Sequence, residues 1–244
     1  MLVGAATLLQ LWERALPLDA AGRAVLLAAS VAPPVGTDEV VEWPLGRRDA
    51  RLLQLRTALS GDTIDAVTVC PSCGAEVSFE VDAAALEQAG EVTEPAEPVV
   101  VDGWHVRCRP ITTADLAAAA TAGDVAAAED LLLQRAVVRA TPPPGVAPTP
   151  VPAQVRRAVT DALAAADPLA EILLDLGCPE CEQGVTATLD VAAFAWATLD
   201  TRARRLLQDV DLLARTYGWS EDEVLALGDQ RRAVYVGLAG GTVS

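Results

Sequence analysis

Cys70-Pro71-Ser72-Cys73 returns 108 positions later in the chain as Cys178-Pro179-Glu180-Cys181. The match continues beyond the cysteines, because hydrophobic and polar residues alternate after each motif and Asp82 corresponds to Asp190. Such alternation predicts a short β-strand, and an aspartate at the strand end is well placed to cap a following helix. Each copy therefore predicts a cysteine turn, which we call a knuckle, then a strand and a capped helical turn.

The two knuckles together supply four thiolates, the ligand set of a closed tetrahedral zinc site. A two-residue spacer lets both sulfurs of a knuckle face one ion. We therefore expect structural Zn²⁺ on Cys70, Cys73, Cys178 and Cys181. The gap between the pairs far exceeds the roughly 15–20 residues of a compact ribbon. We expect a helical segment inserted between the two halves of one zinc-ribbon-like module.

Three other interpretations of these cysteines stay open. A thioredoxin-like redox pair would begin a long helix, whereas strand-like alternation follows each pair here. Disulfides would need an oxidising compartment, which nothing in the sequence indicates. The cysteines could also pack together without a metal.

The rest of the chain predicts a mainly α fold around this small antiparallel β module. Leucines recur at helical spacing near the N-terminus, with Asp19 as a helix cap and Gly61 as a helix end. Valines on both sides of Asp102-Gly103 predict a hairpin at 99–108. Further helices are expected at 113–140, 154–165 and 169–176.

The C-terminal part is the most strongly patterned. Asp200 is expected to cap a helix that Gly218 ends, and Ser220 with Glu223 forms a capping box. We divide the chain into N-terminal helices (1–61), the first knuckle with its strands (62–110), a helical insert with a proline-rich loop at 142–152 (111–176), the second knuckle (177–199) and C-terminal helices (200–244).

Composition and charge restrict the classes of function. The 244 residues include 18 arginines, no lysine and 34 acidic residues, so the formal net charge is −16. This charge repels phosphate backbones and anionic membrane surfaces, which disfavours nucleic-acid and membrane partners. The sequence shows no signal peptide and no apolar run near the roughly 20 residues of a membrane span. We expect a cytoplasmic protein.

No catalytic constellation can be assembled from the sequence. His105 is the only histidine, and it lies on the opposite strand face from Cys108, which we expect to be a buried thiol. Four thiolates would leave a zinc ion no open position for water or substrate. We expect no enzyme activity and no small-molecule substrate.

The order of several segments resembles a known family. These segments are Leu8 to Arg14, Leu45 to Leu53, the two knuckles, Arg107 to Leu116, Tyr217 to Ser220 and Arg231 to Tyr235. The pattern resembles baseplate-associated proteins of contractile phage tails and contractile injection systems. The resemblance implies a structural or assembly role beside other baseplate, tube or spike proteins. It leaves two roles open, an assembly factor or a component incorporated into such a particle, and it implies no catalytic residues.

Aromatic and arginine side chains near the C-terminus are the candidate partner-binding residues, because such residues dominate interface hot spots. They are Tyr217, Trp219, Arg231, Arg232 and Tyr235. The competing interpretation is that the aromatic rings fill the core.

A second class of function is a zinc-ribbon protein associated with nucleic acid or transcription, since paired knuckles also occur there. The charge of −16, the absence of lysine and the lack of a basic and aromatic stripe around either knuckle argue against it.

Overall fold

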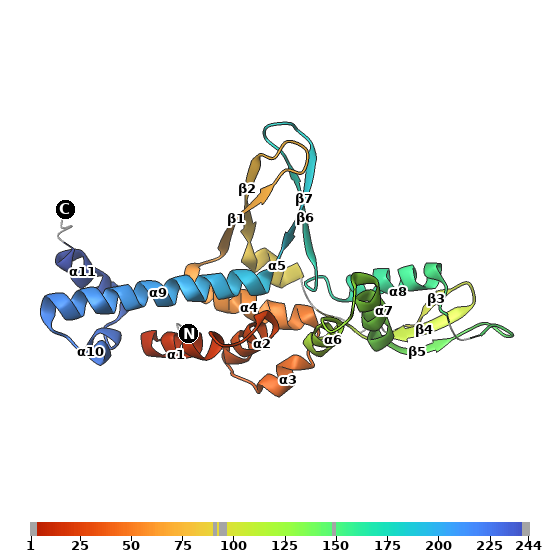
Figure 1. Cartoon of the computed structure of the whole chain (residues 1–244), viewed down its shortest axis with the longest axis horizontal. Coiled ribbons are helices and arrows are strands. Elements are labelled where there is room, and N and C mark those ends of the chain that lie inside the picture. Colours follow the sequence, from red (N-terminus) through yellow and green to blue (C-terminus); the bar gives the residue numbers. More distant parts are fainter. Residues whose placement is uncertain (1–3, 90–91, 93–96, 148–149, 241–244) are drawn as a thin grey trace.

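The computed structural model describes residues 4–89, 92, 97–147 and 150–240, and this part of the chain is mainly helical with three small antiparallel sheets. A central helical body carries three projections: a pair of hairpins, an inserted unit and a C-terminal unit (Figure 1). The helices of the body are α1 (Ala5–Ala15), α2 (Ala20–Ser30), α3 (Thr37–Val41), α4 (Leu45–Ser60), α5 (Ala83–Ala89) and the first part of α9 (Val191–Tyr217).

The body forms because α1, α2 and α4 each bury one apolar face against α9. Leu27, Leu52 and Leu199 are fully buried in this core. Asp19 caps α2 by accepting a hydrogen bond from the Gly22 N–H at 2.7 Å, and Gly61 ends α4, as the sequence predicts. The fold class expected from the sequence is thus confirmed in its coarse form, a mainly α chain with small antiparallel sheets.

Two β-hairpins stand side by side above the body and form what we call the arm (Figure 1). The strands are β1 (Thr63–Val69), β2 (Glu76–Asp82), β6 (Ile172–Gly177) and β7 (Gly184–Leu189). Each hairpin is a separate two-stranded sheet. The strand bases belong to the core of the body, whereas the tips form a small cluster of their own.

The helix expected at 169–176 is wrong, because residues 172–177 form strand β6. This strand pairs antiparallel with β7 from Ile172 opposite Leu189 to Gly177 opposite Gly184. A short apolar run does not distinguish a strand from a buried helix. Here the antiparallel pairing with β7 makes the segment a strand. The insert therefore ends before β6, and the second knuckle has a strand on both sides.

The insert is a small unit with its own core. It contains β3 (Val99–Val101), β4 (Trp104–Cys108), β5 (Val137–Thr141), α6 (Thr113–Ala119), α7 (Val125–Ala136) and α8 (Ala153–Ala166). The hairpin at Asp102-Gly103 is confirmed. The helix expected over 113–140 is instead two helices and β5, because Val137 to Thr141 pair with β4. In the proline-rich loop, residues 148–149 lie outside the described residues.

The C-terminal helix begins earlier than the sequence predicts. Asp190 is the N-cap of the 27-residue helix α9, and its carboxylate accepts the Ala193 N–H at 2.9 Å. Asp200 lies inside this helix, where it accepts hydrogen bonds from Trp12 and Arg204, so the expected cap at Asp200 is wrong. The boundary drawn at 199/200 therefore crosses one continuous helix.

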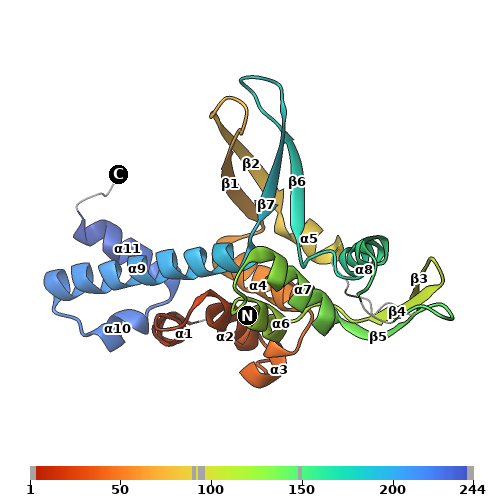
Figure 2. The ribbon, with the colours of Figure 1, turned by 45° about the vertical axis from the view of Figure 1, so that its right-hand side comes forward.

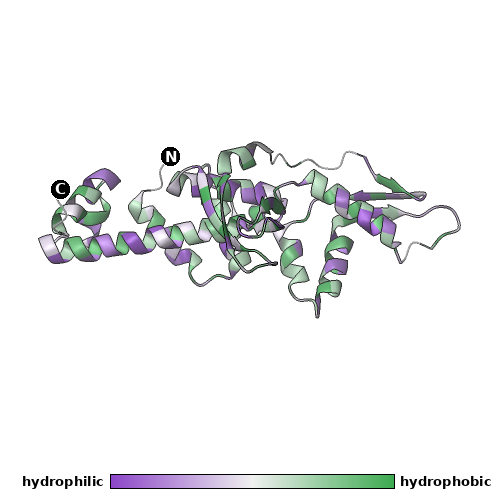
Figure 3. Ribbon diagram, turned by 90° about the horizontal axis from the view of Figure 1, so that it is seen from above, coloured by the Kyte–Doolittle hydropathy of each residue, from purple (hydrophilic) through white to green (hydrophobic). Residues whose placement is uncertain are grey.

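Beyond the body, helix α9 contains both hydrophobic and hydrophilic residues along its length (Figure 3). It is followed by the C-terminal unit, which consists of α10 (Glu221–Leu225) and α11 (Asp229–Ala239). Gly218 ends α9 in the left-handed conformation, with φ of 71°. Ser220 and Glu223 form the expected capping box of α10. Residues 241–244 lie outside the described residues.

Candidate metal centre

The two knuckles adopt the same backbone turn. In the first, the Cys70 N–H donates to the Ala75 carbonyl at 2.9 Å, and in the second the Cys178 N–H donates to the Gln183 carbonyl at 2.9 Å. The residue after each second cysteine has a positive φ, 76° at Gly74 and 57° at Glu182. Each turn therefore points both of its sulfurs toward the other hairpin.

The four knuckle sulfurs lie together at the tip of the arm. The Sγ atoms of Cys70 and Cys181 are 3.7 Å apart, and those of Cys73 and Cys178 are 3.6 Å apart. All four sulfurs lie within 4.8 Å of one another. A disulfide needs sulfurs about 2.05 Å apart, so these cysteines are free thiols. The four side chains could hold a metal ion.

Burial and backbone N–H groups differ among the four thiols. Cys70 and Cys178 are almost fully buried, with 1% and 2% of their surface exposed, whereas Cys73 is exposed. The N–H groups of Cys73 and Ser72 lower the pKa of the Cys70 thiol to about 6. The N–H of Gln183 also lowers the pKa of Cys181, but burial and the other three thiols raise it to about 12. Mutual repulsion thus opposes full ionisation of the cluster, and a bound cation would relieve it.

Few other contacts hold the tips of the arm together. Apart from the cysteines, the buried part of the tip cluster consists of Val77 and Val185, with Ala75 and Leu176 packed beside it. The knuckle cluster is also the one group of three or more metal-ligating side chains found in the described residues. A metal would therefore be the main connection between the two tips.

The three C-terminal aromatic rings gather at the far end of α9. The ring centroids of Tyr217 and Trp219 are 4.9 Å apart, and Tyr235 packs edge-on against both rings. Tyr217 is 39% exposed, and the other two rings are half-buried. The rings therefore pack on one another, outside the main core of the body.

The two candidate arginines have different surroundings. Arg231 is exposed on α11. Arg232 is only 8% exposed, and its guanidinium pairs with Asp229 at 2.6 Å and Asp209 at 3.4 Å. The pair with Asp209 joins α11 to α9, and the pair with Asp229 lies within α11. Little of the Arg232 side chain is left exposed, and its role in partner binding stays a prediction.

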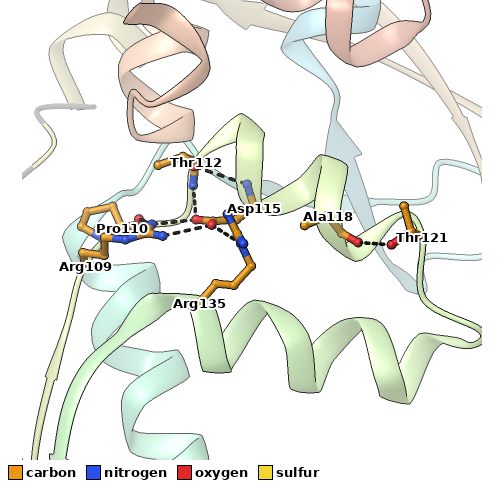
Figure 4. A network of polar contacts seen from close by, with 7 residues as sticks. All are labelled: Arg109, Pro110, Thr112, Asp115, Ala118, Thr121 and Arg135. Atoms are coloured by element: carbon orange, nitrogen blue, oxygen red, sulfur yellow. Dashed lines mark hydrogen bonds and ion pairs between the residues drawn. The ribbon is translucent and has the colours of Figure 1, made fainter. Parts of the chain in front are cut away.

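A buried polar joint between the insert and the body was not foreseen from the sequence. Asp115 is fully buried and accepts two hydrogen bonds from Arg109, one from Arg135 at 2.7 Å and one from the Thr112 N–H at 3.0 Å (Figure 4). These bonds hold the pKa of Asp115 well below its usual range, against the opposing effect of burial. The carboxylate therefore ties β4, α6 and α7 together.

The joint continues into helix α4. Arg48 donates to the Thr113 hydroxyl at 3.1 Å, and the Gly46 N–H donates to one oxygen of Asp167 at 3.0 Å. A Cβ atom at Gly46 would lie 1.8 Å from the other oxygen of Asp167, so only glycine fits there. That oxygen is buried without a hydrogen-bond partner, and burial raises the pKa of Asp167.

Cys108 and His105 lie apart from the metal centre, in strand β4. Cys108 is buried as expected, and burial raises the pKa of its thiol. His105 is exposed on the opposite face of the strand.

Comparison with known proteins adds no relative: no family model matches the chain, and no curated protein or solved structure matches it. Among the described residues, no helix is both long enough and apolar enough to cross a membrane.

Proposed function

We propose that this chain is a non-enzymatic structural or assembly component of the baseplate of a contractile tail or injection system. It acts through protein–protein contacts and is stabilised by a structural zinc ion on Cys70, Cys73, Cys178 and Cys181. One observation carries the proposal: two knuckles 108 positions apart bring four thiols within 4.8 Å of one another. The link to baseplates comes from the resemblance of the sequence segments.

Zinc is the metal that suits this ligand set best. Zn–S bonds of about 2.3 Å in a tetrahedron put neighbouring sulfurs about 3.8 Å apart. The pairs at 3.6 and 3.7 Å agree with that spacing. Thiolate ligands also select zinc over the hard cations, which prefer oxygen. We infer that the two hairpins and their knuckles form one zinc-ribbon-like module when the ion is bound.

The expected ion has a structural role, because four thiolates fill its coordination sphere and leave no place for water or substrate. In the arm, the ion would join two hairpins that form separate two-stranded sheets. A fixed arm, an insert held by a buried joint and a C-terminal unit give the molecule several surfaces at fixed positions (Figure 2). Such a shape suits an adaptor between other proteins.

The proposed partner contact at the C-terminal end uses the exposed edges of Tyr217, Trp219 and Tyr235, together with Arg231. Val234 and Leu238 lie on α11 with Tyr235 and are 63% and 50% exposed, so this helix adds apolar surface at the C-terminal end. Aromatic residues and arginine are the residue types that contribute most to interface affinity.

The test of the proposed function is to tag the protein in its native host and identify its neighbours by cross-linking mass spectrometry. We expect cross-links to sheath, tube, spike or other baseplate proteins, and Tyr217→Ala should weaken them without changing the melting temperature. Cross-links to RNA polymerase or ribosomal proteins, or co-purifying nucleic acid, would instead support a nucleic-acid-associated zinc ribbon. A large fall in melting temperature would assign the aromatic rings to the core of the C-terminal unit.

A further inference from the structure

One face of the sheet in the insert is covered and the other is open. Trp104, Val106 and Cys108 in β4 are buried, and they pack with Val155 and Val159 of α8. Because side chains alternate along a strand, His105 and Arg107 point to the opposite face, where both are exposed. The sheet lies at the end of the molecule away from the C-terminal unit (Figure 2).

The strand register places like charges opposite each other on this open face. Arg107 in β4 pairs directly with Arg139 in β5, and His105 lies opposite Val100 on one side and Thr141 on the other. Like charges at directly opposed positions destabilise an antiparallel pair. The open face thus carries two arginines and the only histidine of the chain, and none of these paired positions holds an acid.

No acidic residue in the part of the chain that the structure describes neutralises these charges. Within the described residues, neither Arg107 nor Arg139 has a carboxylate within 4.0 Å. Three other arginines of the insert do have acidic partners, since Arg109 and Arg135 bind Asp115, and Arg156 binds Asp130. In a chain with 34 acidic residues, two unneutralised arginines placed face to face reduce stability without any internal gain. Such a cost is typical of a binding surface.

We propose that the open face of β3, β4 and β5 binds an acidic segment of a partner protein. Arginine forks bind carboxylates through paired, charge-assisted hydrogen bonds, and a bound acid would remove the repulsion between Arg107 and Arg139. A protein segment fits better than single-stranded nucleic acid, because the open face presents valine, threonine, arginine and one histidine but no phenylalanine, tyrosine or tryptophan ring on which a base could stack. The inference depends neither on zinc nor on the baseplate assignment.

The test compares Arg107→Glu with Arg157→Glu. Arg157 is exposed on α8 and has no ion pair among the described residues, so both variants change the net charge equally. The probe is a fluorescein-labelled peptide of ten glutamates, with binding followed by fluorescence anisotropy at low salt. We expect Arg107→Glu to weaken binding by about tenfold or more, because the new carboxylate repels the glutamates of the peptide that Arg107 attracts. Arg157→Glu should bind as the wild type does.

A second measurement separates binding from folding. Arg107→Glu places opposite charges across the strand pair, so its melting temperature should rise by about 1–4 °C. Weaker peptide binding in a more stable variant would support the proposal, since a merely structural role predicts no such combination. Equal peptide affinity of the wild type and Arg107→Glu, or no binding by the wild type, would overturn it. Tighter binding of a fluorescein-labelled oligothymidylate than of the glutamate peptide would overturn the choice of a protein partner.

Discussion

Replacing Cys178 by serine removes one of the two buried sulfurs of the metal centre, and the result should be a local opening of the arm. The bases of β1 and β6 stay anchored, because Ile64 and Ile172 lie in the core of the body. The tips have little else to hold them, since Val77 and Val185 are the buried residues of the tip cluster besides the cysteines.

The size of the expected loss of stability in the arm follows from the loop that the metal closes. Seven residues run from Ile64 to Cys70 and seven from Ile172 to Cys178, and they form a ring with the ion and the core contact. Closing a ring of about 15 residues is worth about 3 kcal/mol in the chain-entropy model. The much longer stretch between the knuckles contributes little, because the body and the buried joint already restrain it.

Hydrogen exchange with mass spectrometry measures this loss directly. In Cys178→Ser, amides next to the knuckles should exchange up to about 100-fold faster, the equivalent of about 3 kcal/mol. Helix α4 should keep its protection, and a chelator should give the same pattern in the wild-type protein. Cys108→Ser is the matched control, since Cys108 lies in the separate core of the insert. Unchanged exchange in Cys178→Ser, or an equal loss of protection in the arm and in α4, would show that no metal holds the tips of the arm together.

Three further predictions concern single residues elsewhere in the fold. Glu182 has a positive φ of 57°, so Glu182→Gly should raise the stability of the arm by about 0.5–1 kcal/mol in a denaturant titration; a fall would show that the turn is unstrained. Gly46→Ala should lower the free energy of unfolding by about 2–3 kcal/mol, because the new Cβ atom would lie 1.8 Å from Asp167, and an unchanged denaturation midpoint would contradict this packing. Asp115→Asn should cost about 1.5–3 kcal/mol, because the buried acceptor loses charge-assisted hydrogen bonds from two arginines that are themselves 36% and 39% exposed. The pKa of Asp115 is lowered by folding, so its contribution is fully present above the unfolded value near 3.9 and is lost as the pH falls below it. The stability difference between the wild type and Asp115→Asn should therefore shrink below about pH 4, and a difference independent of pH would contradict the ionised state of Asp115.

Sequence patterns within a few residues predicted the helix caps and the turns, because the hydrogen bonds of these features join residues close together in the chain. The caps at Asp19, Asp82 and Asp190 lie where the sequence indicates them, as does the hairpin at Asp102-Gly103. The repeat of the knuckles correctly placed four sulfurs in one cluster, because both copies fold into the same turn at matching positions.

Long-range contacts account for the errors. Segment 169–176 is expected to be a helix because its apolar run has no clear period, although strand β6 corresponds to β1 at the 108-residue offset of the repeat. Asp200 has the chemistry of a helix cap, but Trp12 and Arg204 bind its carboxylate inside α9. The buried joint brings Gly46 and Arg48 of α4 to Asp167 and Thr113 of the insert, and no sequence spacing encodes that meeting.

X-ray absorption at the zinc edge, on protein purified without chelators, identifies the ligand atoms of the proposed metal centre. The four-cysteine site predicts one zinc per chain, bound by four sulfurs at about 2.3 Å. A metal content near zero, or nitrogen and oxygen neighbours around the zinc in place of sulfur, would contradict the proposed centre on Cys70, Cys73, Cys178 and Cys181.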